Sequence, residues 1–582
     1  MERRALISRR GLLAGGAGLV GATALASCGP NTARPRTPAS AGRATGTAQT
    51  PGRGDPAGVP AERQIIRLNL GAEPGTIDPQ KVAYVGEIAI VMRLFSNLLA
   101  FDGKGHLVPE MAERLPAISA DGKTLTFTLR RGLLYSDGHP LQAKDFEYGW
   151  KRHLDPRTAG EYAFTGYAIE GAEEFHSAGA ADQATLNQVR DAVGVQAAGD
   201  RLLIFTLKHP APWFLSVLAT WCGVPTRQDL VEQGGDTWTE PPTYVGNGPY
   251  ILKTWEHDSR LVLEANPNYY RGAPSLTTID LAMIGEPAAA FAAYGNGELD
   301  LVSVESEDLP VVEGDAELRR QYQRFPGRCT TYLGFNTTLA PFDHPAVRRA
   351  FAAALDRDEF VSQVLGAIGV PAEQLVPPGL PGSYRDLQGQ RFDPAQARRL
   401  LAGAGFPGGE GLPAITFTYA ATPANEARVA ALSEQLQRNL GVSVEAEPVE
   451  ARAYTARLQS QETTPQVFLA GWCQEYPDPQ NWYSTVFHSG SMASGGIAGH
   501  TGWANAEFDR LAEQADAEQD QIRRQALYQR AAQLLIDEAP VAFLYHTAVS
   551  RLVQPYVAGL PQNPLDYYPG QSNLSGLTIL KH

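Results

Sequence analysis

The sequence predicts a mixed α/β fold, and three patterns along the chain support this class. Several short segments alternate polar and apolar residues, as half-buried strands do. They are residues 63–70, 124–130, 202–207, 261–264 and 415–419. Helix starts such as Asp343-His344-Pro345 and Asp393-Pro394 precede apolar residues at helical spacing. In the second half strands and helices alternate, for example a helix predicted at residues 424–440, which Gly441 ends, and a strand predicted at residues 442–446. This order is typical of an open α/β lobe with a mostly parallel sheet.

The chain begins with an export signal at residues 1–27. Two pairs of arginines precede an apolar stretch at residues 11–26 that is too short and too rich in glycine to span a bilayer. The stretch ends in Leu-Ala-Ser-Cys at Cys28 and looks like a lipoprotein signal, in which Cys28 is acylated and becomes the new N-terminus. A plain cleaved signal with an incidental cysteine is the alternative. Arg9-Arg10 also resembles a twin-arginine signal, so twin-arginine export and general secretion both stay open.

Residues 28–60 are predicted to be a lipidated, disordered tether. After Cys28 the segment consists mainly of Gly, Pro, Ala, Thr, Ser and Arg, and Val59 is its only aliphatic side chain larger than alanine. Such a composition cannot bury a core, and a tether of this kind holds a globular body away from a membrane surface. We therefore expect an extracytoplasmic protein that is attached to the cell membrane through lipid alone.

From about residue 62 the composition is that of a globular protein. The remaining length suggests three or four units of structure at roughly 150 residues per domain. The whole chain carries 49 basic and 63 acidic residues, a net charge of -14, and such an acidic surface repels nucleic acid. In an oxidising compartment one pair of the cysteines Cys222, Cys329 and Cys473 can form a disulfide, which leaves one free thiol.

Catalytic motifs are missing from the sequence. There is no G-x-S-x-G, H-E-x-x-H or G-x-x-x-x-G-K-[ST] pattern, and the eleven histidines show no metal-ligand spacing. We therefore expect no metal and no cofactor. This does not exclude an enzyme, because a pair of catalytic carboxylates has no sequence signature.

The most distinctive stretch is residues 471–483, which read Gly-Trp-Cys-Gln-Glu-Tyr-Pro-Asp-Pro-Gln-Asn-Trp-Tyr after an apolar strand predicted at residues 467–472. Ligand sites in open α/β sheets lie at the carboxyl ends of strands, and this stretch leaves such an end. A carboxylate among aromatic rings suits an ammonium group, through ion pairing and cation–π attraction. A packed loop whose Trp and Tyr belong to the core is the alternative.

Eight further short motifs are spread over the chain, and their order and spacing are more specific than any one of them. They are Ile-Asp-Pro at 77–79, Tyr-Ser-Asp-Gly-His-Pro at 135–140, Gly-Asn-Gly-Pro-Tyr at 246–250, Asn-Pro-Asn-Tyr-Tyr at 266–270, Gly-Glu-Leu-Asp at 297–300, Phe-Asp-His-Pro-Ala-Val-Arg at 342–348, Leu-Asp-Arg at 355–357 and Ile-Leu-Lys-His at 579–582. Together with residues 471–483, these motifs resemble the oligopeptide-binding proteins of bacterial ABC importers, extracytoplasmic solute-binding protein family 5.

The resemblance implies a periplasmic-binding-protein-like fold of class II (cluster C type). Two α/β lobes are joined by two crossing strands, an additional domain is inserted in the first lobe, and peptide is enclosed when the lobes close. The segments of this chain are then assigned as follows. Lobe one comprises residues 62–101, 224–328 and 554–582, the inserted domain residues 102–223, and lobe two residues 329–553.

The resemblance also implies which residues hold the ligand. In this family an extended peptide adds to protein strands, and Gly471, Cys473 and Val85 match positions that offer it backbone groups. Glu475 falls where relatives place an aspartate that pairs with the α-ammonium of the peptide, and the side chain here is one methylene longer. Asp478 is the second candidate carboxylate.

Aromatic positions of the family site have counterparts here as well. Tyr162 matches a pocket-lining tyrosine of the inserted domain, with an ordinary packing role as the alternative. Tyr545 and His546 fall in a strand near the hinge where the family presents tyrosines to the ligand, and Trp472 lies within the binding stretch.

Two cysteines match a disulfide found in some family members. They are Cys329 and Cys473, and a bridge between them would fasten the start of lobe two to the binding stretch. This pairing would leave Cys222 as a buried free thiol beside Trp221.

The function that the resemblance implies is a monomeric, membrane-tethered receptor. It would capture oligopeptides and deliver them to the transmembrane permease of an ABC transporter, without catalysis. A receptor of the same fold for a nickel chelate, haem, a sugar or a modified amine is the alternative. A secreted hydrolase that uses Glu475 and Asp478 as an acid/base pair is a remote alternative. Peptide length and sequence preference do not follow from the resemblance.

Overall fold

The computed structural model describes residues 60–102, 105–490, 501–560 and 577–582. The predicted signal peptide, Cys28 and the predicted tether up to residue 59 lie outside the described residues. Among the described helices, none is long and apolar enough to cross a membrane.

Lobe one is built on a four-stranded sheet with the order β1-β10-β9-β8. Its strands are β1 (Ile65–Asn69), β8 (Tyr250–Glu256), β9 (Arg260–Ala265) and β10 (Thr278–Ala282). β1 and β10 run parallel and the other neighbours antiparallel. The strands predicted at residues 63–70 and 261–264 are therefore confirmed.

The inserted domain is built on a second, wholly antiparallel sheet with the order β4-β5-β7-β6. Its strands are β4 (Ala117–Ile118), β5 (Thr124–Thr128), β6 (Val195–Ala197) and β7 (Leu202–Thr206). A turn at Asp121-Gly122 joins β4 to β5, and Gly122 has a positive φ of 73° that suits glycine. The predicted strands at residues 124–130 and 202–207 are β5 and β7.

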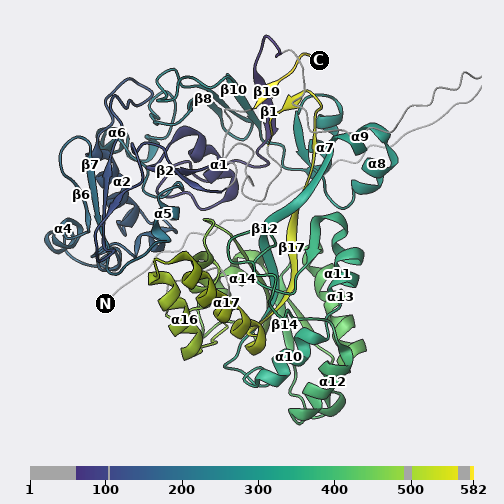
Figure 1. The fold of residues 1–582 in the computed structure, drawn as a ribbon. Helices are drawn as coiled ribbons and strands as arrows, with labels where there is room; N and C mark the ends of the chain where they lie inside the picture. Colours follow the sequence, from purple (N-terminus) through teal and green to yellow (C-terminus); the bar gives the residue numbers. More distant parts are fainter. Residues whose placement is uncertain (1–59, 103–104, 491–500, 561–576) are drawn as a thin grey trace, which may run out of the picture. The chain divides into compact units, whose positions relative to one another are not determined.

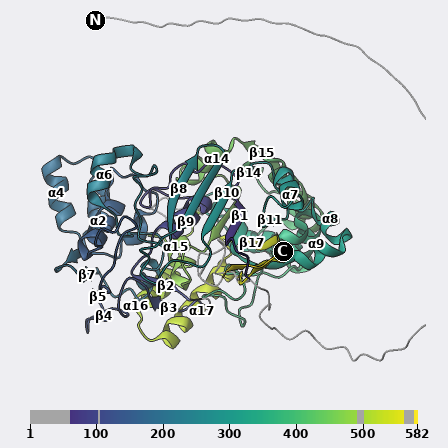
Figure 2. The ribbon, with the colours of Figure 1, turned by 90° about the horizontal axis from the view of Figure 1, so that it is seen from above.

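Short helices and strand pairs surround these two sheets. The helices are α1 (Val85–Leu94), α2 (Ala143–Leu154), η1 (Ala163–Gly166), α3 (Ala172–Ser177), α4 (Gln183–Asp191), α5 (Phe214–Val217), α6 (Gln228–Gly234), η2 (Gly235–Thr237), α7 (Pro287–Gly295), α8 (Leu309–Gly314) and α9 (Ala316–Gln321). The strand pairs are β2 (Leu99–Phe101) with β3 (Leu107–Pro109), and β18 (Val557–Ala558) with β19 (Thr578–Ile579). Figure 2 shows α2, α4 and α6 gathered on one side and α7, α8 and α9 on the opposite side.

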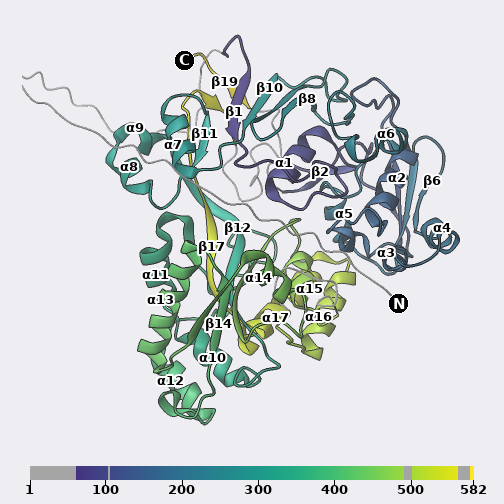
Figure 3. The same cartoon turned by 180° about the vertical axis from the view of Figure 1, so that it is seen from behind.

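Lobe two is built on a seven-stranded sheet with the order β11-β17-β12-β16-β14-β15, and β13 pairs with β17. Its strands are β11 (Leu301–Ser303), β12 (Tyr322–Phe335), β13 (Gly369–Pro371), β14 (Thr416–Ala420), β15 (Glu445–Val449), β16 (Val467–Cys473) and β17 (Val541–Val553). β12 and β17 are the two long strands that run from the region of β11 into the body of lobe two (Figure 1), and the view from behind agrees (Figure 3).

The prediction of a mostly parallel sheet is wrong. Only β14, β15 and β16 are parallel, and every other pair in the sheet is antiparallel. The reason lies in the connectivity, because the chain enters lobe two along β12 and leaves it along β17. A strand that enters and a strand that leaves side by side must run in opposite directions.

Helices cover the sheet of lobe two. They are α10 (Pro345–Ala353), α11 (Arg357–Phe360), η3 (Val361–Leu365), η4 (Gly366–Ile368), α12 (Pro394–Gly403), η5 (Pro407–Gly409), α13 (Pro423–Leu440), α14 (Ala451–Leu458), η6 (Pro479–Asn481), α15 (Ser484–Phe487), α16 (Ala506–Ala517) and α17 (Gln521–Glu538). Asp393 caps α12 by accepting a hydrogen bond from the backbone N–H of Gln396 at 2.8 Å. The helices predicted to begin at Pro345 and Pro394 are confirmed.

The apolar core separates along the faces of this sheet. Leu333 and Phe335 of β12 belong to one buried cluster, and Tyr332, directly before Leu333, belongs to another. This alternation is expected of a strand that is covered on both faces. The lobe boundaries at residues 328–329 and 553–554 stay a prediction. By this division β11 and the first half of β12 belong to lobe one, although they share the sheet of lobe two.

Candidate ligand-binding site

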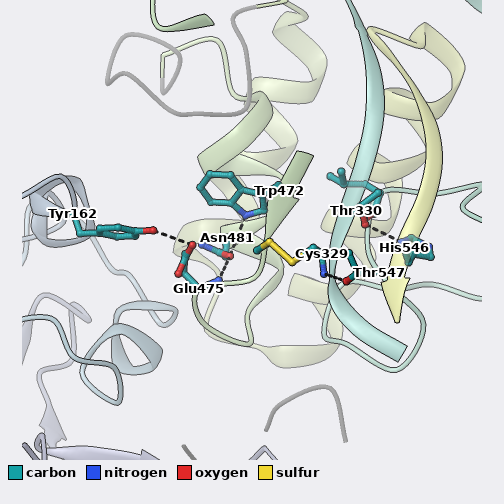
Figure 4. The surroundings of a disulfide bond; sticks show 10 residues. Tyr162, Cys329, Thr330, Trp472, Glu475, Asn481, His546 and Thr547 are labelled. Atoms are coloured by element: carbon teal, nitrogen blue, oxygen red, sulfur yellow. Dashed lines mark hydrogen bonds between the residues drawn. A yellow bond between two sulfur atoms is a disulfide. The ribbon is translucent and has the colours of Figure 1, made fainter. Parts of the chain in front are cut away.

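A disulfide fastens the predicted binding stretch to the sheet of lobe two. Cys329 of β12 and Cys473 of β16 lie opposite each other, with 3.9 Å between their Cα atoms, and their sulfur atoms are bonded (Figure 4). The predicted pairing is confirmed, and Cys222 is the buried free thiol that it leaves. Burial raises the pKa of Cys222 to about 11.

The backbone at Gly471 leaves no room for a side chain. A Cβ atom at this position would lie 2.8 Å from the carbonyl oxygen of Thr330 on the neighbouring strand. Glycine therefore lets β16 approach β12 closely, immediately before the chain turns out of the sheet.

Asn481 holds the turn that presents Glu475. Its Oδ1 accepts hydrogen bonds from the backbone N–H of Glu475 at 2.9 Å and from Nε1 of Trp472 at 3.2 Å. The Glu475 side chain extends from this turn toward the inserted domain, where the hydroxyl of Tyr162 donates to its Oε1 at 3.1 Å. Figure 4 shows Tyr162 and Glu475 pointing toward one another from the two sides.

The environment of Glu475 disfavours the ionised form of its carboxyl group. Burial raises the pKa of this carboxyl above its usual range, and the nearby Arg328 guanidinium and the hydrogen bond from Tyr162 oppose the rise only in part. An ammonium group that arrived here would restore the charged form of the carboxylate and pair with it.

Glu475 lines a cavity of about 500 Å³ between the lobes. Gln474 and Pro477 of the same turn lie in its wall, and Trp221 and Arg271 approach it from the other side. This volume lies within the roughly 300–1,000 Å³ that is typical of small-ligand sites.

The turn also contacts the inserted domain through an aromatic stack. Tyr476 is almost fully buried, and its ring lies parallel to Trp213, with 6.1 Å between the ring centroids. Tyr476 thus belongs to the core of the first two sheets although it follows a strand of lobe two.

Asp478 is held by a partner within lobe two. Both terminal nitrogens of Arg524 donate to its carboxylate, at 2.9 and 2.6 Å, and both side chains are buried. One oxygen also accepts from the backbone N–H of Gln480 at the start of η6. This arrangement lends no support to an acid/base pair of Asp478 with Glu475.

The remaining predicted ligand residues do not line the cavity at Glu475. Trp472 and Tyr545 are buried in the core clusters of lobe two. His546 is buried beside Thr330, whose hydroxyl lies 2.8 Å from Nδ1, and burial lowers the pKa of His546 to about 3. Val85, the first residue of α1, is 46% exposed.

Sequence reasoning missed the charged residues on the far side of the cavity. Glu110 and Arg271 both line it, and they come from segments far apart in the chain. Neither stands in a motif that would have singled out its side chain. Within the described residues no group of three or more His, Cys, Asp or Glu side chains could hold a metal ion.

Comparison with known proteins decides the family. Residues 106–494 match the model for bacterial extracellular solute-binding proteins, family 5. The chain belongs to this family. The predicted resemblance and two-lobe fold class are therefore confirmed, and the family is one of binding proteins that act outside the cytoplasm.

Relatives agree over nearly the whole chain. A probable deoxycholate-binding periplasmic protein of Escherichia coli, YgiS, is 32% identical over 520 residues, which cover 88% of this chain and 94% of YgiS. The periplasmic oligopeptide-binding protein OppA of Salmonella typhimurium is 31% identical over 541 residues, which cover 90% and 95%. The solved structure of the unliganded open form of the murein tripeptide-binding protein MppA superposes with a TM-score of 0.74 at 29% identity and covers 90% and 99%.

Proposed function

We propose that this protein is a lipid-anchored extracytoplasmic receptor that binds oligopeptides between its lobes and delivers them to an ABC permease. The observation that carries the proposal is the buried carboxylate of Glu475, in a cavity that is lined from both lobes. The name of OppA, a relative at 31% identity, supports a peptide as the ligand.

Glu475 suits the amino terminus of a peptide for an electrostatic reason. An α-ammonium group is a compact cation with three donors, and a partly desolvated carboxylate binds it more strongly than a solvated one does. The hydroxyl oxygen of Tyr162 lies beside the carboxylate and can accept a second hydrogen bond from the same ammonium.

Thermal melting with defined peptides tests this proposal. Trialanine at 100 times its Kd should stabilise the folded protein by about 2.7 kcal/mol, and N-acetyltrialanine should leave the melting temperature unchanged. Glu475→Gln should reduce the shift at the same peptide concentration, whereas Glu462→Gln, at an exposed position, should retain it in full. Equal shifts with the free and acetylated peptides, or no shift with peptides of any length, would count against an ammonium site.

The lipid anchor is tested separately at Cys28. Replacing Cys28 with serine should release the protein from the membrane fraction, because acyl chains are the only attachment proposed. Mass spectrometry of the mature N-terminus identifies the modification directly. A Cys28→Ser protein that stays on the membrane would contradict the anchor.

A receptor for an amphipathic carboxylate is the second candidate. YgiS is 32% identical, its name assigns it deoxycholate, and the cavity here combines apolar side chains such as Phe95 and Leu99 with the guanidinium of Arg271. Deoxycholate in the same melting assay distinguishes this ligand from peptides.

A further inference from the structure

The cavity at Glu475 has balanced charges. Three arginines and three acids line it: Arg93, Asp102, Glu110, Arg271, Arg328 and Glu475. Because these charges cancel, the cavity complements a ligand that carries both signs better than a net cation or a net anion.

Arg271 is the arginine best placed to meet a ligand. It follows the Asn-Pro-Asn-Tyr-Tyr motif after β9, and its side chain is accessible to solvent. Its guanidinium carbon lies 5.2 Å from the centroid of the Tyr270 ring, and its Nε donates to the Tyr270 hydroxyl at 2.5 Å. These contacts orient the guanidinium, and the described part of the chain offers no acceptor to its two terminal nitrogens and no carboxylate within 4 Å.

The acid nearest to Arg271 already has other donors. Oε1 of Glu110 accepts from the hydroxyls of Ser96 and Tyr269, both at 3.0 Å. Arg130 also lies over Tyr270, with 5.4 Å between its guanidinium carbon and the ring centroid. Two guanidinium groups thus lie near one ring and one carboxyl. Burial raises the pKa of Glu110, so its carboxyl is neutral more readily and then offsets less of the charge of Arg271.

We infer that Arg271 forms a second charged subsite, which binds a ligand carboxylate while Glu475 binds the ammonium. A planar guanidinium with two free terminal nitrogens matches a carboxylate in a bidentate pair. The preferred ligand is then a compact zwitterion, a short peptide with a free carboxyl terminus that fits a cavity of about 500 Å³. This inference rests on the proposed peptide function.

A double-mutant cycle between protein and ligand tests the subsite. Titration calorimetry gives Kd for trialanine and for trialanine amide with the wild type and with Arg271→Gln. The wild type should prefer the free acid by about 5-fold, the value expected for a partly exposed ion pair, and Arg271→Gln should bind both peptides equally. Arg349→Gln, at an exposed position on α10, is the matched control and should keep the preference.

The outcomes separate the subsite from the peptide function. If Arg271→Gln still prefers trialanine over trialanine amide as the wild type does, the subsite is overturned. This holds even if the variant melts at a lower temperature, because a purely structural role of Arg271 would lower stability without changing the preference for the free acid. Binding of peptides without any preference in the wild type overturns the subsite and leaves the proposed function standing. Deoxycholate binding that Arg271→Gln weakens, in a protein that binds no peptide, overturns the peptide function and supports the carboxylate subsite.

Discussion

Replacing Glu475 with glutamine should weaken peptide binding and stabilise the empty protein at the same time. Glutamine keeps the shape of the side chain and an oxygen that can accept from Tyr162, and it removes only the charge. A hydrogen bond to a charged group contributes about 1.5–3 kcal/mol, so Kd for trialanine should rise roughly 10- to 150-fold.

The effect on stability follows from the direction of the pKa shift. Burial raises the pKa of Glu475 in the folded protein above its unfolded value, so the folded state holds its proton more tightly. Stability is therefore lost as the pH rises from the unfolded pKa, about 4.3, through the raised folded pKa. Near neutral pH the Glu475→Gln variant should melt at a higher temperature than the wild type, and below about pH 4 the difference should vanish.

The pH dependence of binding gives a second measurement of the same group. A bound ammonium favours the charged carboxylate, so peptide binding should expel a proton at pH values below the raised pKa of Glu475. Affinity should fall on the acid side of that pKa and again above about pH 8, where the α-amino group of the peptide loses its charge. Titration calorimetry in two buffers of different ionisation enthalpy counts the protons. An affinity that stays flat between about pH 4 and pH 7, or a glutamine variant that binds trialanine as the wild type does, would refute the role of this carboxylate.

Three other perturbations test the architecture around the site. The disulfide closes a loop of 144 residues. Replacing Cys329 and Cys473 with alanine should therefore lower the free energy of unfolding by up to about 5 kcal/mol in the chain-entropy model. A denaturant midpoint that the double replacement leaves unchanged would contradict this. Gly471→Ala places a methyl group against the backbone of β12 and should cost about 1–3 kcal/mol, seen as a lower melting temperature. Asp478→Asn leaves the buried charge of Arg524 without its carboxylate, which should destabilise lobe two by about 3–5 kcal/mol and leave the preference for free over acetylated peptide unchanged in the folded fraction.

Local patterns in the sequence predicted local structure well. The start of α12 at Pro394 follows from the capping side chain of Asp393, which acts within three residues. The end of α13 was also predicted, because Gly441 adopts the left-handed conformation that favours glycine, with φ of 74°. A strand follows the helix as predicted, but the predicted start at residue 442 is wrong, because β15 begins three residues later at Glu445. Val442 lies in the connection between α13 and β15 and is buried in the core. A buried apolar residue there has the same sequence character as a residue of a buried strand.

Long-range features were visible only through the family resemblance or not at all. The pairing of Cys329 with Cys473 depends on the register of β12 with β16, and no local pattern specifies that register. Glu110 and Arg271 share a cavity although 160 residues separate them in the sequence. Their proximity results from the packing of the β2–β3 pair against the segment after β9, and a single sequence does not display such packing.

The turn after β16 takes part in both the cavity and the contact between lobe two and the inserted domain. It presents Glu475 to the cavity, and through Tyr476 it packs against Trp213 of the inserted domain. Asn481 holds the whole turn by accepting from the backbone of Glu475 and from the indole of Trp472. Because the acid and the interlobe contact belong to one rigid turn, an opening of the lobes that separates Tyr476 from Trp213 must also withdraw Glu475 from Tyr162. A ligand that paired with Glu475 would therefore favour the closed arrangement of the lobes. The free energy by which the ligand stabilises closure equals the free energy by which closure strengthens ligand binding.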